Sequence, residues 1–429
     1  MKNFLMACLI GIVFSMYIFP FEFHALPGIN TKMMLAVVGL VLFILNLIAK
    51  RTSDIGKDMF GVTVFAMLFS LVSYFSVVYN NTTDMAYATY FVSMWVWVGA
   101  AYCIIELIRK VHGHVSLQLI FHYWACVCVV QLCIALVIDS VPAFQSFVDT
   151  YISQNEEYLH RTGRLYGIGS RFDAAGIRFS CGLVGLGYLI THKPSQFWLW
   201  GYWGMFSFIL VVGNMMSRTT IVGVFLSIIY MVFVKFNKRL TLNKRQMKSV
   251  LIWVAGLLAA ISFVVYKYNN SFDFHQNMRY AFEFFFNYLE TGEFETSSTN
   301  RLKAMVVWPD NFQTWVIGDG WFANPENPDS FYKYTDVGYL RLIYYCGLIG
   351  FFSFLHMFLY IVNRLSLKWP LDRVLFVLLL ILQLIVWIKI STDIFQFLVL
   401  LLLLPHTGNI TTENIFDDYD TEKDPLLLA

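Results

Sequence analysis

The chain has 429 residues, of which 58% are hydrophobic and 14% are charged, with a formal net charge of +2. A soluble globular protein carries about 25% charged residues, so this composition excludes an ordinary soluble domain and favours a protein whose solvent is largely lipid. A net charge this close to zero gives no reason to expect nucleic acid as a partner, and we predict none.

Apolar segments recur along the chain at lengths that suit membrane crossing. A spanning helix needs about 20 mainly apolar residues, because the hydrocarbon core is about 30 Å thick. The first segment is followed by Pro20, Phe21 and Glu22 rather than by a small-residue cleavage site, so we expect a membrane helix and not a signal peptide. The predicted spans are 4–19, 32–49, 59–79, 86–108, 115–139, 176–191, 196–213, 219–236, 250–266, 338–362, 374–389 and 393–404. The last two are short, and one long tilted helix is the alternative to two separate spans.

The distribution of basic residues predicts how the chain is oriented. If the N-terminus is cytoplasmic and the spans alternate, every inner connection contains Lys or Arg, and the short outer connections are nearly bare of them. This is the bias that sets membrane topology. We therefore expect both termini in the cytoplasm and the two long connections, at about 140–175 and 267–337, on the outer face.

These observations predict an all-α integral membrane protein with about 12 transmembrane helices and two long periplasmic loops. Residues 1–404 are expected to form a single polytopic membrane domain in the bacterial inner (cytoplasmic) membrane. Residues 405–429 are acidic and polar, which is typical of a disordered tail. Within the second long loop, a short helix is expected to begin near Ser298 and to end before Pro309.

Arginine is concentrated in the connections that are predicted to lie outside. Guanidinium groups bind phosphate through paired hydrogen bonds, and a charge at the mouth of a membrane helix is a functional candidate by default. Arg218 is the strongest of them, because it stands between Met216 and an apolar helix. For each loop arginine the alternative is an ordinary solvated charge in contact with lipid headgroups. The cationic candidates are Arg161, Arg164, Arg171, Arg178, Arg218, Arg301, Lys303 and, within the tenth predicted span, Arg341.

Carboxylates on the same face are candidates for a general base. Asp336 directly precedes a predicted span, where it could take a proton from a sugar hydroxyl. It could equally be the N-cap of that helix, because Asp is a preferred cap. Asp173 lies among the arginines of the first long loop, and Asp310 and Asp319 lie in the second. No His, Cys and carboxylate cluster has the spacing of a zinc site, and no nucleotide-binding loop is present, so neither a metal nor a cofactor is expected.

Three groups of residues carry a resemblance to a known family. The first is Arg164–Leu–Tyr–Gly, followed by Asp173 and Gly176, and the second is Ser217–Arg218–Thr219 at the start of a helix. The third runs through the second long loop: Ser298–Thr–Asn–Arg301, Trp308, Ile317–Gly–Asp–Gly320, Asp336–Val–Gly–Tyr–Leu340 and Gly347–Leu–Ile–Gly350. Together with the topology, they resemble the Wzy-type O-antigen and capsular polysaccharide polymerases of the O-antigen ligase-like superfamily.

The resemblance implies a metal-independent glycosyltransferase that joins oligosaccharide repeat units carried on undecaprenyl pyrophosphate. It implies catalytic roles for Arg218, Arg301 and Asp336, and substrate binding by Arg164, Arg171, Asp173, Arg178 and Arg341. Membrane lipid, a chain-length regulator and a flippase are the other implied partners. Ligases of this superfamily carry a histidine where Thr335–Asp336 stands here, which favours a polymerase over an O-antigen ligase. A transporter of polysaccharide or of a small molecule is the main alternative that is not an enzyme.

Overall fold

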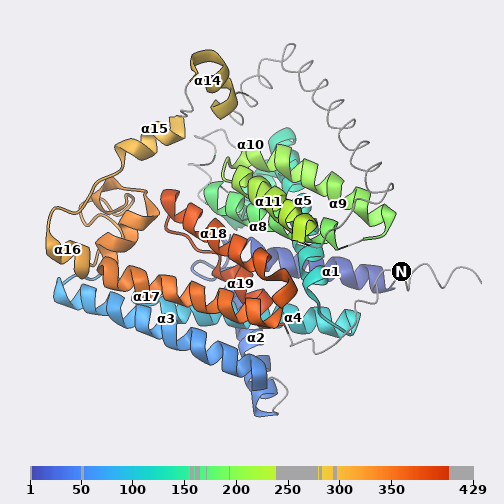
Figure 1. Ribbon diagram of the computed structural model, residues 1–429, viewed down its shortest axis with the longest axis horizontal. Helices are drawn as coiled ribbons and strands as arrows, with labels where there is room; N and C mark the ends of the chain where they lie inside the picture. Colours follow the sequence, from blue (N-terminus) through green and yellow to red (C-terminus); the bar gives the residue numbers. More distant parts are fainter. Residues whose placement is uncertain are drawn as a thin grey trace, which may run out of the picture.

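The computed structural model describes residues 2–49, 53–154, 159, 165–170, 172–192, 194–237, 279, 283–292 and 297–404 (Figure 1). The structure of these residues is mostly helical. The long helices are α1 (Lys2–Ile18), α2 (Thr31–Ile48), α3 (Ser53–Tyr79), α4 (Tyr90–His112), α5 (Leu117–Ser140), α8 (Phe172–Thr191), α9 (Gln196–Phe208), α11 (Thr220–Asn237), α17 (Gly338–Lys368) and α18 (Arg373–Lys389). The shorter helices are α6 (Pro142–Tyr151), α10 (Asn214–Met216), α14 (Glu283–Thr291), α15 (Ser297–Ala304), α16 (Phe312–Val316) and α19 (Phe395–Leu402).

Within the described residues, eight helices are long and apolar enough to cross a membrane: Thr31–Ile48, Ile55–Tyr79, Tyr90–His112, Leu117–Ser140, Phe172–Thr191, Gln196–Met216, Gly338–Lys368 and Pro370–Lys389. The apolar helices Leu5–Ile18 and Thr220–Val234 are shorter and match the first and eighth predicted spans. An all-α multi-pass membrane protein is therefore the architecture, with eight qualifying helices in the described part of the chain. The ninth predicted span, 250–266, and the tail, 405–429, lie outside the described residues.

The segment predicted as the last span is a short helix that follows a break. α18 ends at Lys389, Ile390 is extended (φ −138°, ψ 154°), and α19 begins at Phe395. The two segments are thus separate and do not form one long helix. With 8 residues, α19 is only about 12 Å long at 1.5 Å per residue, too short to cross a hydrocarbon core of about 30 Å by itself.

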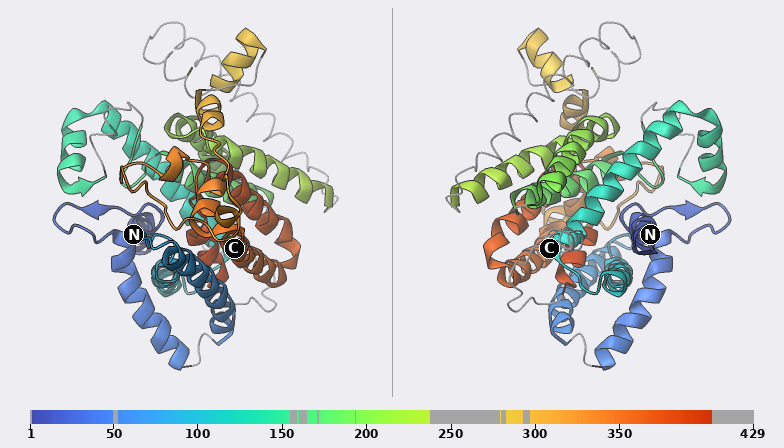
Figure 2. Two further views of the ribbon diagram at one scale, coloured as in Figure 1. Left: turned by 90° about the vertical axis from the view of Figure 1, so that its left-hand side faces the viewer. Right: turned by 90° about the vertical axis from the view of Figure 1, so that its right-hand side faces the viewer.

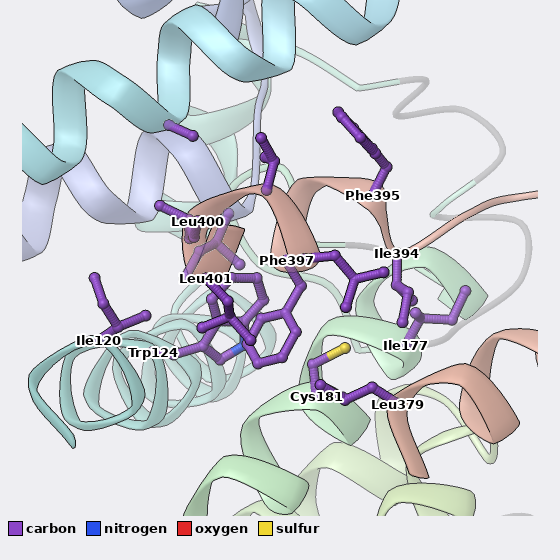
Figure 3. Packing of buried hydrophobic residues seen from close by; sticks show 14 of the residues in the cluster. Ile120, Trp124, Ile177, Cys181, Leu379, Ile394, Phe395, Phe397, Leu400 and Leu401 are labelled. Carbon is purple, nitrogen blue, oxygen red and sulfur yellow. The ribbon is translucent and has the colours of Figure 1, made fainter. Parts of the chain in front are cut away.

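Residues 390–394, called the helix break below, lead into α19, in which every residue is buried; within the break, Ser391 and Ile394 are buried and Thr392 is exposed. Figure 3 shows Phe397 of α19 against Trp124 of α5. The two rings pack edge to face, with their centroids 4.4 Å apart. Irregular backbone that adjoins a buried helix needs hydrogen bonds from within the protein. Gln383 supplies two of them: its Nε2 donates to the Thr392 carbonyl at 3.2 Å, and its Oε1 accepts from the Ile394 amide at 2.7 Å.

Contacts between the connections separate into two groups. Connections predicted to lie outside contact one another: a Cβ on Gly338 would lie 2.3 Å from the Ile390 carbonyl oxygen, and Asn80 donates to the Gly318 carbonyl. Connections predicted to lie inside also pair, as in Arg364–Asp58 at 2.6 Å. The alternation of the predicted spans therefore agrees with these contacts, whereas the membrane and the side that faces the cytoplasm remain predictions.

Both long loops contain short elements that pack on the helices. In the first, α6 is followed by strand β2 (Ile152–Ser153), which pairs antiparallel with β1 (Glu22–Phe23). Figure 2 shows these two strands side by side at the edge of the molecule, in blue and teal. In the second loop, the short helix predicted near Ser298 is confirmed as α15. α16 and the 3₁₀ turn η2 (Tyr332–Tyr334) continue toward α17, which lies along α3 (Figure 1).

Candidate functional site

The candidate site is built around the helix break between α18 and α19. Lys389, the last residue of α18, donates to Asp173 Oδ1 at 2.6 Å. The same carboxylate oxygen accepts from Ser217 Oγ at 3.2 Å and from Thr219 Oγ1 at 2.9 Å. One carboxylate therefore ties the start of α8 to the start of α11 and to the helix break.

Glycine and a π-helical turn make this close approach possible. A Cβ on Gly176 would lie 2.4 Å from Ser217 Oγ, so a larger residue would push Ser217 away from Asp173. α9 continues into the π-helical turn η1 (Ile209–Gly213), and the Gly213 carbonyl accepts from Thr220 Oγ1 at 3.1 Å. Such turns are rare and are frequently found at functional sites.

A small cavity lies beside the helix break, between α4, α8 and α19. Its volume is about 150 Å³, and Trp97, Arg178, Thr392, Asp393, Gln396 and Phe397 contribute to its wall. This space is called the bundle cavity below. In Figure 3, Ile394 and Phe397 extend toward Ile177 and Cys181 of α8 on its apolar side. Tyr90 Oη donates to Asp393 Oδ2 at 3.2 Å, and the Phe395 amide donates to Asp393 Oδ1 at 2.9 Å, so the carboxylate is held on the wall that it shares with Arg178.

Arg218 forms an ion pair with a residue of the second long loop. Its Nη1 lies 2.5 Å from Glu283 Oε2, and the two side chains are 16% and 19% exposed. The guanidinium is thus placed where the sequence predicted it, at the start of α11 and next to Ser217. The guanidinium is already paired with a carboxylate, so an anionic ligand at Arg218 would have to compete with Glu283.

Asp336 and Arg341 form a second ion pair at the start of α17. Arg341 Nη1 lies 3.4 Å from Asp336 Oδ1. The guanidinium carbon lies 4.1 Å from the centre of the Phe322 ring and 3.5 Å from that of the Phe331 ring, which is a double cation–π contact. Arg341 is 6% exposed. Among the described residues, its Nε and Nη2 have no hydrogen-bond partner.

The structure distinguishes between the two roles predicted for Asp336. α17 begins at Gly338 with Val337 as its N-cap, so Asp336 lies one residue before the cap and does not cap the helix. Its carboxylate is 34% exposed and lies beside Arg341. The capping role is therefore wrong, and the role as a general base stays a prediction. Asp319 accepts from Thr314 Oγ1 and from Tyr332 Oη, which indicates a structural role within the loop.

Backbone strain occurs immediately before both acidic groups. Phe172, with φ 48°, precedes Asp173, and Lys333 and Tyr334, with φ 54° and 53°, come shortly before Asp336. Left-handed φ values are unfavourable for bulky residues, and they are concentrated at functional sites. The two strained segments belong to one region, because Gly338 packs on Ile390 and the neighbouring Lys389 holds Asp173.

Of the predicted site residues that lie in the described part of the chain, most are placed on one side or the other of the helix break. Asp173, Arg178 and Arg218 lie on one side, and Asp336 with Arg341 on the other. Arg161, Arg164 and Arg171 lie outside the described residues. Arg301 belongs to α15, and its side chain is not described.

Sequence reasoning missed two ionisable residues at the break, Lys389 and Asp393. Ionisable residues at membrane depth are functional candidates, and this signal could have identified both. In the described part of the chain, no three His, Cys, Asp or Glu residues are grouped as a metal site would require.

Comparison of the chain with models of known protein families, with curated proteins and with solved structures finds no match.

Proposed function

We propose that the chain is a membrane glycosyltransferase that polymerises oligosaccharide repeat units, carried on undecaprenyl pyrophosphate, into O-antigen or capsular polysaccharide. The observation that carries the proposal is the helix break, where Lys389 and Asp393 lie beside Asp173 and Arg178 of α8 among apolar helices. A lipid-linked pyrophosphate has the matching chemistry, because its anionic head needs cations while its polyprenyl chain needs an apolar surface.

The proposed reaction transfers the growing glycan from its carrier to a hydroxyl of the next repeat unit. A bond forms between the anomeric carbon of the donor and the acceptor oxygen, while the bond from that carbon to the pyrophosphate breaks. The acceptor proton passes to a carboxylate, and the lipid pyrophosphate leaves with the bonding electrons. No metal or nucleotide is required, because the donor already carries a good leaving group.

The residues divide between these steps by their chemistry. Arg218 and Arg301 would stabilise the charge that develops on the leaving pyrophosphate. Asp336 would be the general base, since its carboxylate is 34% exposed and could reach an acceptor hydroxyl beside Arg341. Arg164, Arg171, Asp173, Arg178 and Arg341 would bind or orient the substrate. Asp393 is a second candidate base, because it shares the bundle cavity with Arg178.

The proposed location follows from the charge bias. The chain lies in the bacterial inner membrane with both termini in the cytoplasm, so the helix break is on the periplasmic side. A flippase that delivers lipid-linked repeat units and a regulator of chain length are the proposed partner proteins.

A transporter is the second candidate, and the helix break is the observation that favours it. Secondary carriers bind their substrates where transmembrane helices are interrupted near the midplane. The backbone is likewise broken between α18 and α19, with Lys389 directly before the break and Asp393 within it.

One experiment separates these functions. The gene is deleted, and the surface glycan and the lipid-linked pool are compared with those of the parent and of a complemented strain. A polymerase predicts single repeat units on the periplasmic side of the membrane and a surface glycan of one unit. An O-antigen ligase predicts full-length polymer that stays on the lipid carrier. A transporter of the lipid-linked unit predicts single units that stay on the cytoplasmic side, and either of the last two results refutes the proposal.

A further inference from the structure

A second cavity lies at the edge of the bundle, where the two short strands pair. β1 and β2 join the connection after α1 to the first long loop, with Glu22 opposite Ser153. The volume of this open pocket is about 390 Å³, which falls within the ~300–1,000 Å³ typical of small-ligand sites. This space is called the clasp cavity below. It is lined by Phe21, Glu22, Asn30, Lys32, Ser153 and Gln154.

Local geometry holds the walls of the clasp cavity in place. Gln154 Oε1 accepts from the Gly169 amide at 3.2 Å. Gly169 has φ +67°, and a Cβ there would lie 2.4 Å from the Phe19 carbonyl oxygen, so only glycine fits. Asn30 caps α2 by accepting from the Met33 amide at 3.2 Å. The polar side of the clasp cavity is therefore held by backbone contacts at Gln154, Gly169 and Asn30, which belong to three separate segments.

The side chains of the clasp cavity have balanced charge. Among the described residues that line it, one carboxylate (Glu22) is matched by one ammonium (Lys32), so these side chains together favour neither a strong anion nor a strong cation. The amides of Asn30 and Gln154 and the hydroxyl of Ser153 each offer both donors and acceptors. Phe21 adds an apolar surface. A ligand that fits is neutral, carries many groups that both donate and accept hydrogen bonds, and has one apolar face.

We propose that the clasp cavity is a saccharide-binding subsite that holds a sugar ring of the glycan. A pyranose ring has the required chemistry, because its hydroxyls donate and accept while its C–H groups form an apolar face. This inference rests on the proposed function, which supplies an oligosaccharide as substrate. It adds the place where part of that oligosaccharide is held and the residues that recognise it.

The position of the clasp cavity agrees with this role. Lys32 lines the clasp cavity, and its Nζ lies 4.5 Å from the centre of the Trp97 ring, which forms a wall of the bundle cavity. Asp393 and Arg178 line the bundle cavity together with Trp97. A sugar in the clasp cavity would therefore lie next to the charged groups at the helix break.

Glycan binding by the purified full-length protein tests the proposal. The protein in lipid nanodiscs is applied to a panel of bacterial surface oligosaccharides, and dissociation constants are measured for those that bind. Glu22→Gln and Gln154→Ala are compared with wild type. Glu106→Gln is the matched control. Glu106 also forms a polar contact, to Arg109 at 2.5 Å, but it does not line the clasp cavity. Elution profile and thermal unfolding establish that each variant is folded.

We expect the wild type to bind at least one oligosaccharide, both clasp variants to bind it about ten-fold or more weakly, and the control to stay within about two-fold. Absence of binding by the wild type, or equal binding by the clasp variants, would overturn the subsite. The proposed function fails separately: if deletion of the gene leaves the polymer intact while the clasp variants still lose glycan binding, the chain binds saccharide without polymerising it.

Discussion

Replacing Asp336 by Asn tests the proposed general base directly. The amide keeps the shape of the side chain but cannot take up the proton of an acceptor hydroxyl. Because Val337 and not Asp336 is the N-cap of α17, the substitution removes no helix cap. It does remove the counter-charge of Arg341, so a loss of stability must be separated from a loss of chemistry.

The size of the stability effect follows from the geometry of the ion pair. At 3.4 Å, two unit charges attract by about 5 kcal/mol for an effective dielectric constant of about 20. Desolvation offsets most of this attraction. Removing one partner of a fully buried pair costs about 3–5 kcal/mol, whereas exposed pairs contribute about 0.2–1 kcal/mol. Asp336 is 34% exposed and Arg341 is 6% exposed, so the pair lies between these limits. We expect Asp336→Asn to destabilise the protein by roughly 1–3 kcal/mol.

Two further variants separate stability from chemistry. Asp58→Asn is the matched control, because Asp58 is 2% exposed and pairs with Arg364 at 2.6 Å on the predicted cytoplasmic side. It should lose at least as much stability and still make polymer. In the double variant Asp336→Asn/Arg341→Met, no uncompensated charge remains, so stability should recover in part; only thermal unfolding is compared for this variant, because Arg341 is itself a proposed substrate-binding residue.

The assay combines thermal unfolding of the purified variants with gel analysis of the surface glycan from complemented deletion strains. Normal polymer ladders from Asp336→Asn would remove Asp336 from the mechanism and make Asp173 and Asp393 the next candidates. Loss of polymer in Asp58→Asn to the same degree would show that the assay reports instability alone.

Three other predictions follow from the site. Arg218→Ala should abolish the polymer while the protein still accumulates, and Arg218→Lys should impair it, because a point charge cannot replace the paired hydrogen bonds of a guanidinium; wild-type polymer from the alanine variant would exclude the role. Lys389→Met and Asp173→Asn should each destabilise the protein, and a double-mutant cycle on thermal unfolding should give a coupling of about 0.5–3 kcal/mol; a coupling near zero would show that the 2.6 Å contact does not hold the helix break. A cysteine introduced at Pro325 should react with a membrane-impermeant maleimide in intact spheroplasts, and protection there would invert the predicted topology.

Most of the membrane helices could be predicted from the sequence, because their apolar length is a local property. The segment 32–49 was predicted as a span and forms Thr31–Ile48, and the same logic places nine other predicted spans on apolar helices. The bilayer core holds no water to solvate polar groups, so the composition of a segment largely decides whether it crosses the membrane. Asp173 and Arg218 could also be singled out from the sequence, since charge beside an apolar helix is costly unless it is paired or used, and their roles toward a substrate stay predictions.

The helix break and the partners of its charged residues were decided only by the tertiary structure. Nothing local distinguishes a kink from a loop between spans at 390–394, because the unwound backbone is stable only where Gln383 and the surrounding helices satisfy it. The pairing of Lys389 with Asp173 joins residues 216 positions apart, and such a contact has no signature in either segment. Asp336 could have been cap or base by its sequence, and only the start of α17 at Gly338 decides against the cap. The clasp cavity likewise exists because two loops far apart in sequence pair as strands, which no hydropathy pattern records.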